Sequence, residues 1–138
     1  MSTTDVDLKA TVLVIEDNPD DVTLMLRALK KQDLGDRVQV LRDGAAALDY
    51  FFRDGGHPKL IFLDLKLPKV DGLEVLRRLR ADERTQWIPV VVVSSSREER
   101  DVVEGYKFGV SSYILKPISV EAVAECTSEL GLDWIPAE

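Results

Sequence analysis

Five short apolar runs alternate with five helical patterns along this chain of 138 residues. A short, continuously apolar run is typical of a buried parallel strand, because such a strand is covered on both faces. Repeated units of this kind predict an α/β fold, a doubly wound five-stranded parallel sheet with five helices on its two faces. We expect strands at Thr11 to Glu16, Arg37 to Leu41, Leu60 to Asp64, Val90 to Val93 and Ser111 to Leu115.

The first and last helices begin at residues that suit a helix start. Asn18 is a favourable N-cap, Pro19 fits the first helical position, and Asp20 and Asp21 stabilise the positive end of the helix dipole. Ser119 is placed to cap the last helix. We expect helices from Asn18 to Gln32, from Asp43 to Phe52, from Asp71 to Leu79, from Glu98 to Phe108 and from Ser119 to Gly131.

Three acidic residues follow two of the apolar runs: Glu16 and Asp17 come after the first, and Asp64 ends the third. With the strand order 2-1-3-4-5, these two strands are neighbours, and ligands bind outside the strand ends at the point where the winding reverses. The carboxylates should therefore converge. Two unit charges ~5 Å apart repel by about 3 kcal/mol at an effective dielectric constant near 20. We expect Mg²⁺ to relieve that repulsion, because it prefers carboxylate oxygens and keeps waters that phosphate can replace.

Two further polar residues follow the fourth and fifth strands, namely Ser94 and Lys116. Their chemistry is consistent with phosphoryl transfer. Asp64 can attack phosphorus as a carboxylate nucleophile while a metal ion offsets the charge of the incoming group. A serine hydroxyl and a lysine ammonium are suited to two of the remaining phosphoryl oxygens.

From about Thr11 to Leu130, the chain resembles the receiver domain of two-component response regulators, which has a flavodoxin-like fold. The resemblance rests on four motifs in order: Val14 to Asn18, Leu63 to Pro68 with Asp71-Gly72, Val93-Ser94, and Tyr113 to Pro117. It implies that Asp64 is the phosphoacceptor and that a sensor histidine kinase is the donor. It also implies an Mg²⁺ site whose ligands are Asp17, Asp64 and the backbone carbonyl of Lys66, with Glu16 acting through water.

The same resemblance assigns phosphoryl-binding and switch roles to Ser94, Lys116 and Tyr113. In receiver domains of this kind, the serine follows the phosphoryl group and the tyrosine turns inward. The face made by the fourth helix, fifth strand and fifth helix is thereby reshaped for signalling. Lys66 and Ser96 lie where they could set the lifetime of the phosphorylated form, by obstructing or positioning water.

A narrower resemblance involves Ile88 to Ser96 and the ending Leu130 to Pro136, which are similar to stand-alone regulators paired with bacterial phytochrome-type kinases. It implies a bacteriophytochrome as kinase and a homodimer formed through the last strand, last helix and tail. Leu132, Trp134 and Ile135 give the tail an apolar surface that must be covered. Two interpretations remain open: the tail is a dimer arm, or it packs on its own domain.

Composition narrows the function classes. A net charge of −7 disfavours nucleic acid and anionic membranes as partners, since both require a basic surface. No apolar run approaches the ~20 residues of a membrane span, and the N-terminus lacks a signal-peptide core. A single cysteine, Cys126, fits a reducing compartment. We therefore expect a cytoplasmic protein.

The expected organisation is a polar extension at residues 1–10, a receiver domain at 11–130 and a short apolar tail at 131–138, without an output domain. We expect no enzymatic activity beyond self-phosphorylation and self-dephosphorylation.

The alternatives are a phosphate shuttle or sink that passes phosphate to another histidine protein, and a phosphorylation-independent binding module. A phosphohydrolase of the haloacid-dehalogenase type is disfavoured because Lys66 stands where its acid–base aspartate would be. A flavin carrier is disfavoured because the acids after the first strand would repel the flavin phosphate.

Overall fold

The computed structural model describes residues 6–34 and 37–129, where five strands and five helices alternate. The strands are β1 (Val12–Ile15), β2 (Val38–Leu41), β3 (Leu60–Asp64), β4 (Val90–Ser94) and β5 (Ser112–Leu115). The helices are α1 (Pro19–Lys31), α2 (Gly44–Phe52), α3 (Gly72–Ala81), α4 (Arg97–Tyr106) and α5 (Val120–Glu129). Every bound lies within two residues of the predicted one, and β3 has the predicted range.

The five strands form one parallel sheet in the order β2-β1-β3-β4-β5, which confirms the predicted α/β topology. Its register decides what meets at the carboxyl edge. Ile15 pairs with Leu63, so Glu16 and Asp64 follow at the same level on neighbouring strands. Ser94 pairs with Leu115, which places Lys116 next in line at that edge.

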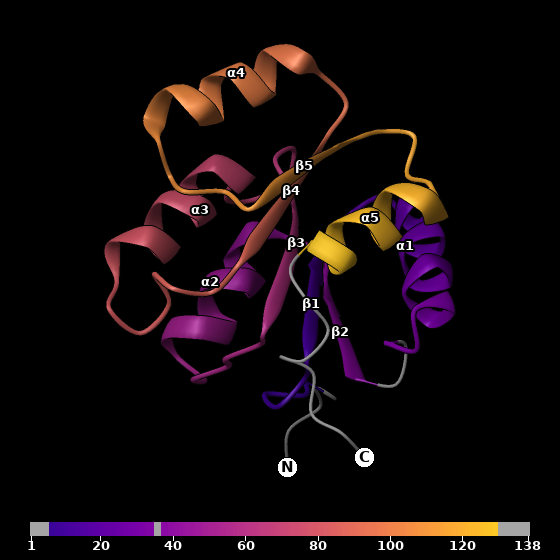
Figure 1. Ribbon diagram of the computed structural model, residues 1–138. Coiled ribbons are helices and arrows are strands. Elements are labelled where there is room, and N and C mark those ends of the chain that lie inside the picture. Colours follow the sequence, from indigo (N-terminus) through magenta and orange to yellow (C-terminus); the bar gives the residue numbers. More distant parts are fainter. Residues whose placement is uncertain (1–5, 35–36, 130–138) are drawn as a thin grey trace.

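Two helical layers cover the sheet: α1 and α5 lie on one face, and α2, α3 and α4 lie on the other (Figure 1). Successive strand residues point to opposite faces, so β1, β3 and β4 supply both cores while being buried throughout. The core beneath α2, α3 and α4 includes Leu13, Ile15, Ile61, Leu63, Val90 and Val92. The core beneath α1 and α5 includes Val12, Val14, Leu60, Phe62, Val91 and Val93.

The predicted helix caps are present. The Asn18 side chain accepts hydrogen bonds from the backbone N–H groups of Asp20 and Asp21, at 2.9 and 3.2 Å. The Ser119 hydroxyl accepts one from the N–H of Ala122 at 3.1 Å. These bonds satisfy donors that a helix leaves unpaired in its first turn, and they fix where α1 and α5 begin relative to the strand ends.

Gly72 allows α3 to start against the end of β3. A Cβ at this position would lie 2.3 Å from the Asp64 carbonyl oxygen and 2.5 Å from the Leu65 Cα, so any larger residue would displace this backbone. Its N–H donates to the Leu65 carbonyl at 2.8 Å. The glycine therefore holds the segment that carries Asp64 in place.

The ends of the chain are only partly described. Near the N-terminus, the Tyr50 hydroxyl donates to the Asp7 carbonyl at 2.7 Å. The predicted tail residues Leu132, Trp134 and Ile135 lie outside the described residues. Within residues 6–34 and 37–129, we find no helix with the length and apolar character needed to cross a membrane.

Candidate functional site

Three carboxylates meet at the carboxyl edge of β1 and β3, as predicted. One oxygen from each of Glu16, Asp17 and Asp64 lies within 4.8 Å of the others. Glu16 and Asp64 are 3% and 4% exposed, whereas Asp17 is exposed. The cluster thus has a buried floor and one side open to solvent. Oxygen ligands with room for water match the preferences of a hard divalent cation.

Lys116 reaches into the same cluster from the end of β5. Its Nζ lies 3.1 Å from Asp64 Oδ2 and 3.2 Å from Glu16 Oε1. The shortest contact, 2.8 Å, is to Asp21 Oδ2 in the first turn of α1. One ammonium therefore bridges three acidic side chains and stabilises the negative charge that they carry.

The electrostatics of this cluster are visible in two pKa values. Burial, the hydrogen bond to Asp64 and the Asp64 charge raise the pKa of Glu16 to about 8. Burial alone would lower the pKa of Lys116, but hydrogen bonds to Asp21 and Asp64 and the surrounding negative charge outweigh it and raise that pKa above its ordinary value. Burial is the largest cause of the Glu16 shift, and the negative charge of Asp64 contributes to the shifts of both residues.

The contact with Asp21 is a feature that the sequence analysis missed. We placed both Asp20 and Asp21 at the helix start, and both do lie in the first turn of α1. Only Asp21 also faces the site. Nothing in the sequence indicates that Lys116, 95 residues away, comes within reach of Asp21.

Ser94 ends β4 as a buried hydroxyl, and its hydrogen bonds run toward α4. Its Oγ lies 2.5 Å from Glu99 Oε1 and 3.0 Å from the Ser96 carbonyl oxygen. A hydroxyl has a single proton, and the charged, nearer carboxylate is the stronger acceptor. Ser94 Oγ also accepts the Ser96 N–H at 3.1 Å. Among the described contacts, none joins the Ser94 hydroxyl to the acidic cluster.

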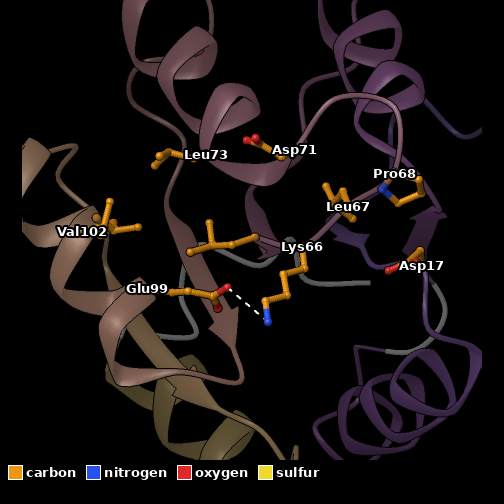
Figure 2. Close-up of a pocket in the computed structure, with 10 residues that line it drawn as sticks. Asp17, Lys66, Leu67, Pro68, Asp71, Leu73, Glu99 and Val102 are labelled. Carbon is orange, nitrogen blue, oxygen red and sulfur yellow. Dashed lines mark ion pairs between the residues drawn. The ribbon is translucent and has the colours of Figure 1, made fainter.

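Lys66 and Glu99 form an ion pair in the lining of a cavity of about 610 Å³, which also includes Asp17 (Figure 2). The Lys66 N–H donates to Asp64 Oδ1 at 3.0 Å, so the backbone here is tied to the predicted phosphoacceptor. The Lys66 Nζ lies 3.7 Å from Glu99 Oε2. The remaining lining residues are Leu65, Leu67, Pro68, Asp71, Leu73, Val102 and Val103.

Tyr113 lies on β5, half-buried, and packs against the core beneath α2, α3 and α4. The Arg100 guanidinium lies over its ring, 4.9 Å from the centroid, and burial raises the pKa of the phenol. Val102 on α4 and Leu115 on β5 are 48% and 37% exposed. The α4 and β5 part of the predicted signalling face therefore presents apolar side chains to solvent.

The sequence matches the family model of the response regulator receiver domain over residues 12–127. The chain belongs to the response regulator receiver domain family. The matched residues include β1 and β3, which carry the acids, and extend into α5. The strand order 2-1-3-4-5 agrees with the family assignment.

Curated relatives of this receiver domain include regulators of similar length. The probable methanogenesis regulatory protein FilR2 of Methanothrix harundinacea is 40% identical over 128 residues, covering 90% of this chain and 83% of the relative. Response regulator Rcp1 of a Synechocystis species is 33% identical over 129 residues, covering 90% and 88%. The chain thus aligns with most of the length of both regulators.

Solved structures give the same family. The bacteriophytochrome response regulator RtBRR is 42% identical, with a TM-score of 0.82 and coverage of 92% of this chain and 81% of that one. The phosphorylated cyanobacterial phytochrome response regulator RcpA is 33% identical, with a TM-score of 0.72 and coverage of 92% and 93%. The Mn²⁺-bound form of Rcp1 is 31% identical, with a TM-score of 0.72 and coverage of 92% and 95%. The acidic cluster of this receiver domain offers the carboxylate oxygens that a divalent cation prefers.

Proposed function

We propose that this receiver domain accepts a phosphoryl group on Asp64 and signals through its α4-β5-α5 face. The observation that carries the proposal is the position of Asp64, which is buried at the sheet edge among Glu16, Asp17 and Lys116. A carboxylate surrounded by a cation site and an ammonium can approach an anionic phosphoryl group without prohibitive repulsion.

The reaction is an in-line transfer from a phosphohistidine of a sensor kinase. An Asp64 oxygen forms a bond to phosphorus as the bond between phosphorus and the histidine nitrogen breaks. The nitrogen keeps the electron pair, so the kinase histidine returns to neutral imidazole after proton exchange with solvent. Hydrolysis removes the modification: a water oxygen forms a bond to phosphorus as the bond between phosphorus and the Asp64 oxygen breaks, so inorganic phosphate leaves and Asp64 recovers its carboxylate.

The proposed metal is Mg²⁺. Asp17, Asp64 and the backbone carbonyl of Lys66 would hold it, and Glu16 would act through a bound water. When bound, the ion supplies charge stabilisation to the phosphoryl oxygens. The donor set supports this assignment, since it is made of oxygens, is strongly anionic and is open to water on the Asp17 side.

Three residues are proposed to bind or respond to the phosphoryl group. Lys116 already contacts Asp64 and can follow an oxygen of the phosphorylated side chain. Ser94 would turn from Glu99 toward the phosphoryl group, and Tyr113 would respond on β5. Lys66 and Ser96 would tune the lifetime of the phosphorylated form through access of water.

We propose a histidine kinase as partner, of the bacteriophytochrome type, because the regulators RtBRR and RcpA carry phytochrome names. We further propose a cytoplasmic homodimer that does not bind nucleic acid. The domain would span residues 11–130, and the tail residues Leu132, Trp134 and Ile135 would serve as a dimer arm. The net charge of −7 supports the nucleic-acid part of this proposal.

Intact-mass measurement after incubation with acetyl phosphate tests the central step. With Mg²⁺, the wild-type protein should gain the mass of one phosphoryl group, and Asp64→Asn should gain none. Chelation of the metal should abolish the gain in the wild type. Equal modification of Asp64→Asn would show that another residue is the acceptor.

A further inference from the structure

Glu99 holds two donors beside the phosphoryl site. It lies in the first turn of α4, and its side chain is 22% exposed. One carboxylate oxygen accepts the Ser94 hydroxyl at 2.5 Å, and the other lies 3.7 Å from the Lys66 ammonium. Ser94 comes from the end of β4 and Lys66 from the segment after β3. A single side chain of α4 thus engages groups from both strand ends.

The Glu99 carboxylate oxygens that contact Ser94 and Lys66 are chemically similar to phosphoryl oxygens, because both are anionic acceptors. Both donors are suited to a tetrahedral anion, and a hydroxyl with one proton can serve only one acceptor at a time. A phosphoryl group carries about −1.5 to −2 charges and three strong acceptor oxygens. It therefore competes with Glu99 for the same donors and repels the Glu99 carboxylate.

We propose that Glu99 is an internal competitor of the phosphoryl group, a positioning residue that holds Ser94 and Lys66 in the unphosphorylated protein. This inference rests on the proposed function of Asp64. Phosphorylation then requires Glu99 to release Ser94. Loss of the charge-assisted hydrogen bond between Ser94 and Glu99 corresponds to about a tenfold change in the equilibrium constant of phosphorylation. Glu99 accordingly lowers the phosphorylated fraction that a weak phosphodonor can reach.

The release acts directly on the start of α4. Ser96 caps this helix through its side chain, which accepts the N–H groups of Glu98 and Glu99 at 3.0 and 3.4 Å. The Ser96 backbone also contacts the Ser94 hydroxyl. When Ser94 turns away, the first turn of α4 loses the Glu99 contact and a Ser96 contact together. The phosphoryl site and the signalling face are linked through this turn.

Glu99→Gln and Glu98→Gln form a matched pair for a test with acetyl phosphate and Mg²⁺. Both substitutions remove one negative charge from the same helix turn, so both weaken the favourable dipole interaction equally. The Glu98 side chain is exposed, and no described contact joins it to Ser94 or Lys66. Glu99→Gln should reach a given phosphorylated fraction at about tenfold lower acetyl phosphate than wild type, and Glu98→Gln should match wild type.

The outcomes separate this inference from the proposed function. If the wild type is phosphorylated on Asp64 and the two glutamine variants behave alike, the competitor role of Glu99 is wrong while the proposed function stands. If the wild type gains no phosphoryl group, both ideas fall. Thermal unfolding of both variants identifies any difference in folding.

A second measurement uses the wild type alone, so that it does not depend on a variant that folds. Amide hydrogen exchange should become faster in the first turn of α4 upon phosphorylation, since the Glu99 contact is then lost. Unchanged protection in that turn, in a sample shown by mass to be phosphorylated, would overturn the inference.

Discussion

Asp17→Asn should stabilise the metal-free protein while removing its response to Mg²⁺. The carboxylate oxygens of Glu16, Asp17 and Asp64 lie within 4.8 Å of one another. A pair of unit charges at this separation repels by about 3 kcal/mol at an effective dielectric constant of 20. Asp17 is exposed, and Lys116 offsets part of the negative charge, so we expect a net gain of about 1 kcal/mol on neutralising Asp17.

The difference in stability should reverse when Mg²⁺ is added, so that the wild type becomes more stable than Asp17→Asn. A ligand that binds only the folded state adds about 2.7 kcal/mol at a concentration of 100 times its dissociation constant. For a domain of this size, that corresponds to a rise in melting temperature of roughly 5 to 10 °C. The wild type should show this rise, whereas Asp17→Asn should show a small fraction of it because one direct ligand is missing.

Thermal unfolding in chelator and in MgCl₂, followed by circular dichroism, measures both effects. Asp20→Asn is the matched control: it removes an exposed negative charge from the first turn of α1, outside the carboxylate cluster. This control should keep the full Mg²⁺ response. An equal Mg²⁺ shift in wild type and Asp17→Asn would refute the metal assignment, and a less stable Asp17→Asn in chelator would refute the repulsion argument.

Three other perturbations test the remaining parts of the site. Lys116→Met should destabilise the metal-free protein by about 3 kcal/mol in urea unfolding, because the buried Asp64 carboxylate loses its cationic partner; an unchanged midpoint would contradict this. The metal-free protein should lose stability as pH rises from about 5 to 8. Its folded state holds a proton on Glu16 up to a pKa of about 8, while the unfolded chain releases it near the ordinary 4.5, so the folded state binds more protons in that window. Denaturant titrations across this range should show the slope in wild type and a weaker one in Glu16→Gln. Lys66→Ala should shorten the lifetime of the phosphorylated form several-fold, measured by mass after removal of acetyl phosphate, and an unchanged rate would remove Lys66 from the control of water access.

Much of the fold and of the acidic site follows from local signals in the sequence. Apolar runs such as Leu60 to Asp64 are too short and too continuously apolar for a surface helix, and their alternation with helices permits few topologies. Because the carboxyl ends of parallel strands share one edge, the positions of Glu16, Asp17 and Asp64 in the sequence were enough to predict their convergence. The caps at Asn18 and Ser119 were equally readable, since a cap acts over only a few residues.

The sequence did not reveal which neighbouring side chains contact the site. Asp20 and Asp21 have the same local signal, yet only Asp21 contacts Lys116, because the packing of α1 against the sheet selects which one faces inward. Likewise, the pairing of Glu99 with Ser94 depends on the angle at which α4 leaves β4. The sequence also did not predict that Trp87, in the segment before β4, is 83% exposed.

The order of strands and the acids at their ends could be predicted from the amino-acid sequence, because they depend on apolar periodicity and on a topology with few solutions. The partners of Lys116, Ser94 and Lys66 became known from the three-dimensional packing. Lys116 and Lys66 meet partners far away in the chain, and Ser94 meets one across the turn into α4, so each contact depends on helix placements that local sequence does not encode.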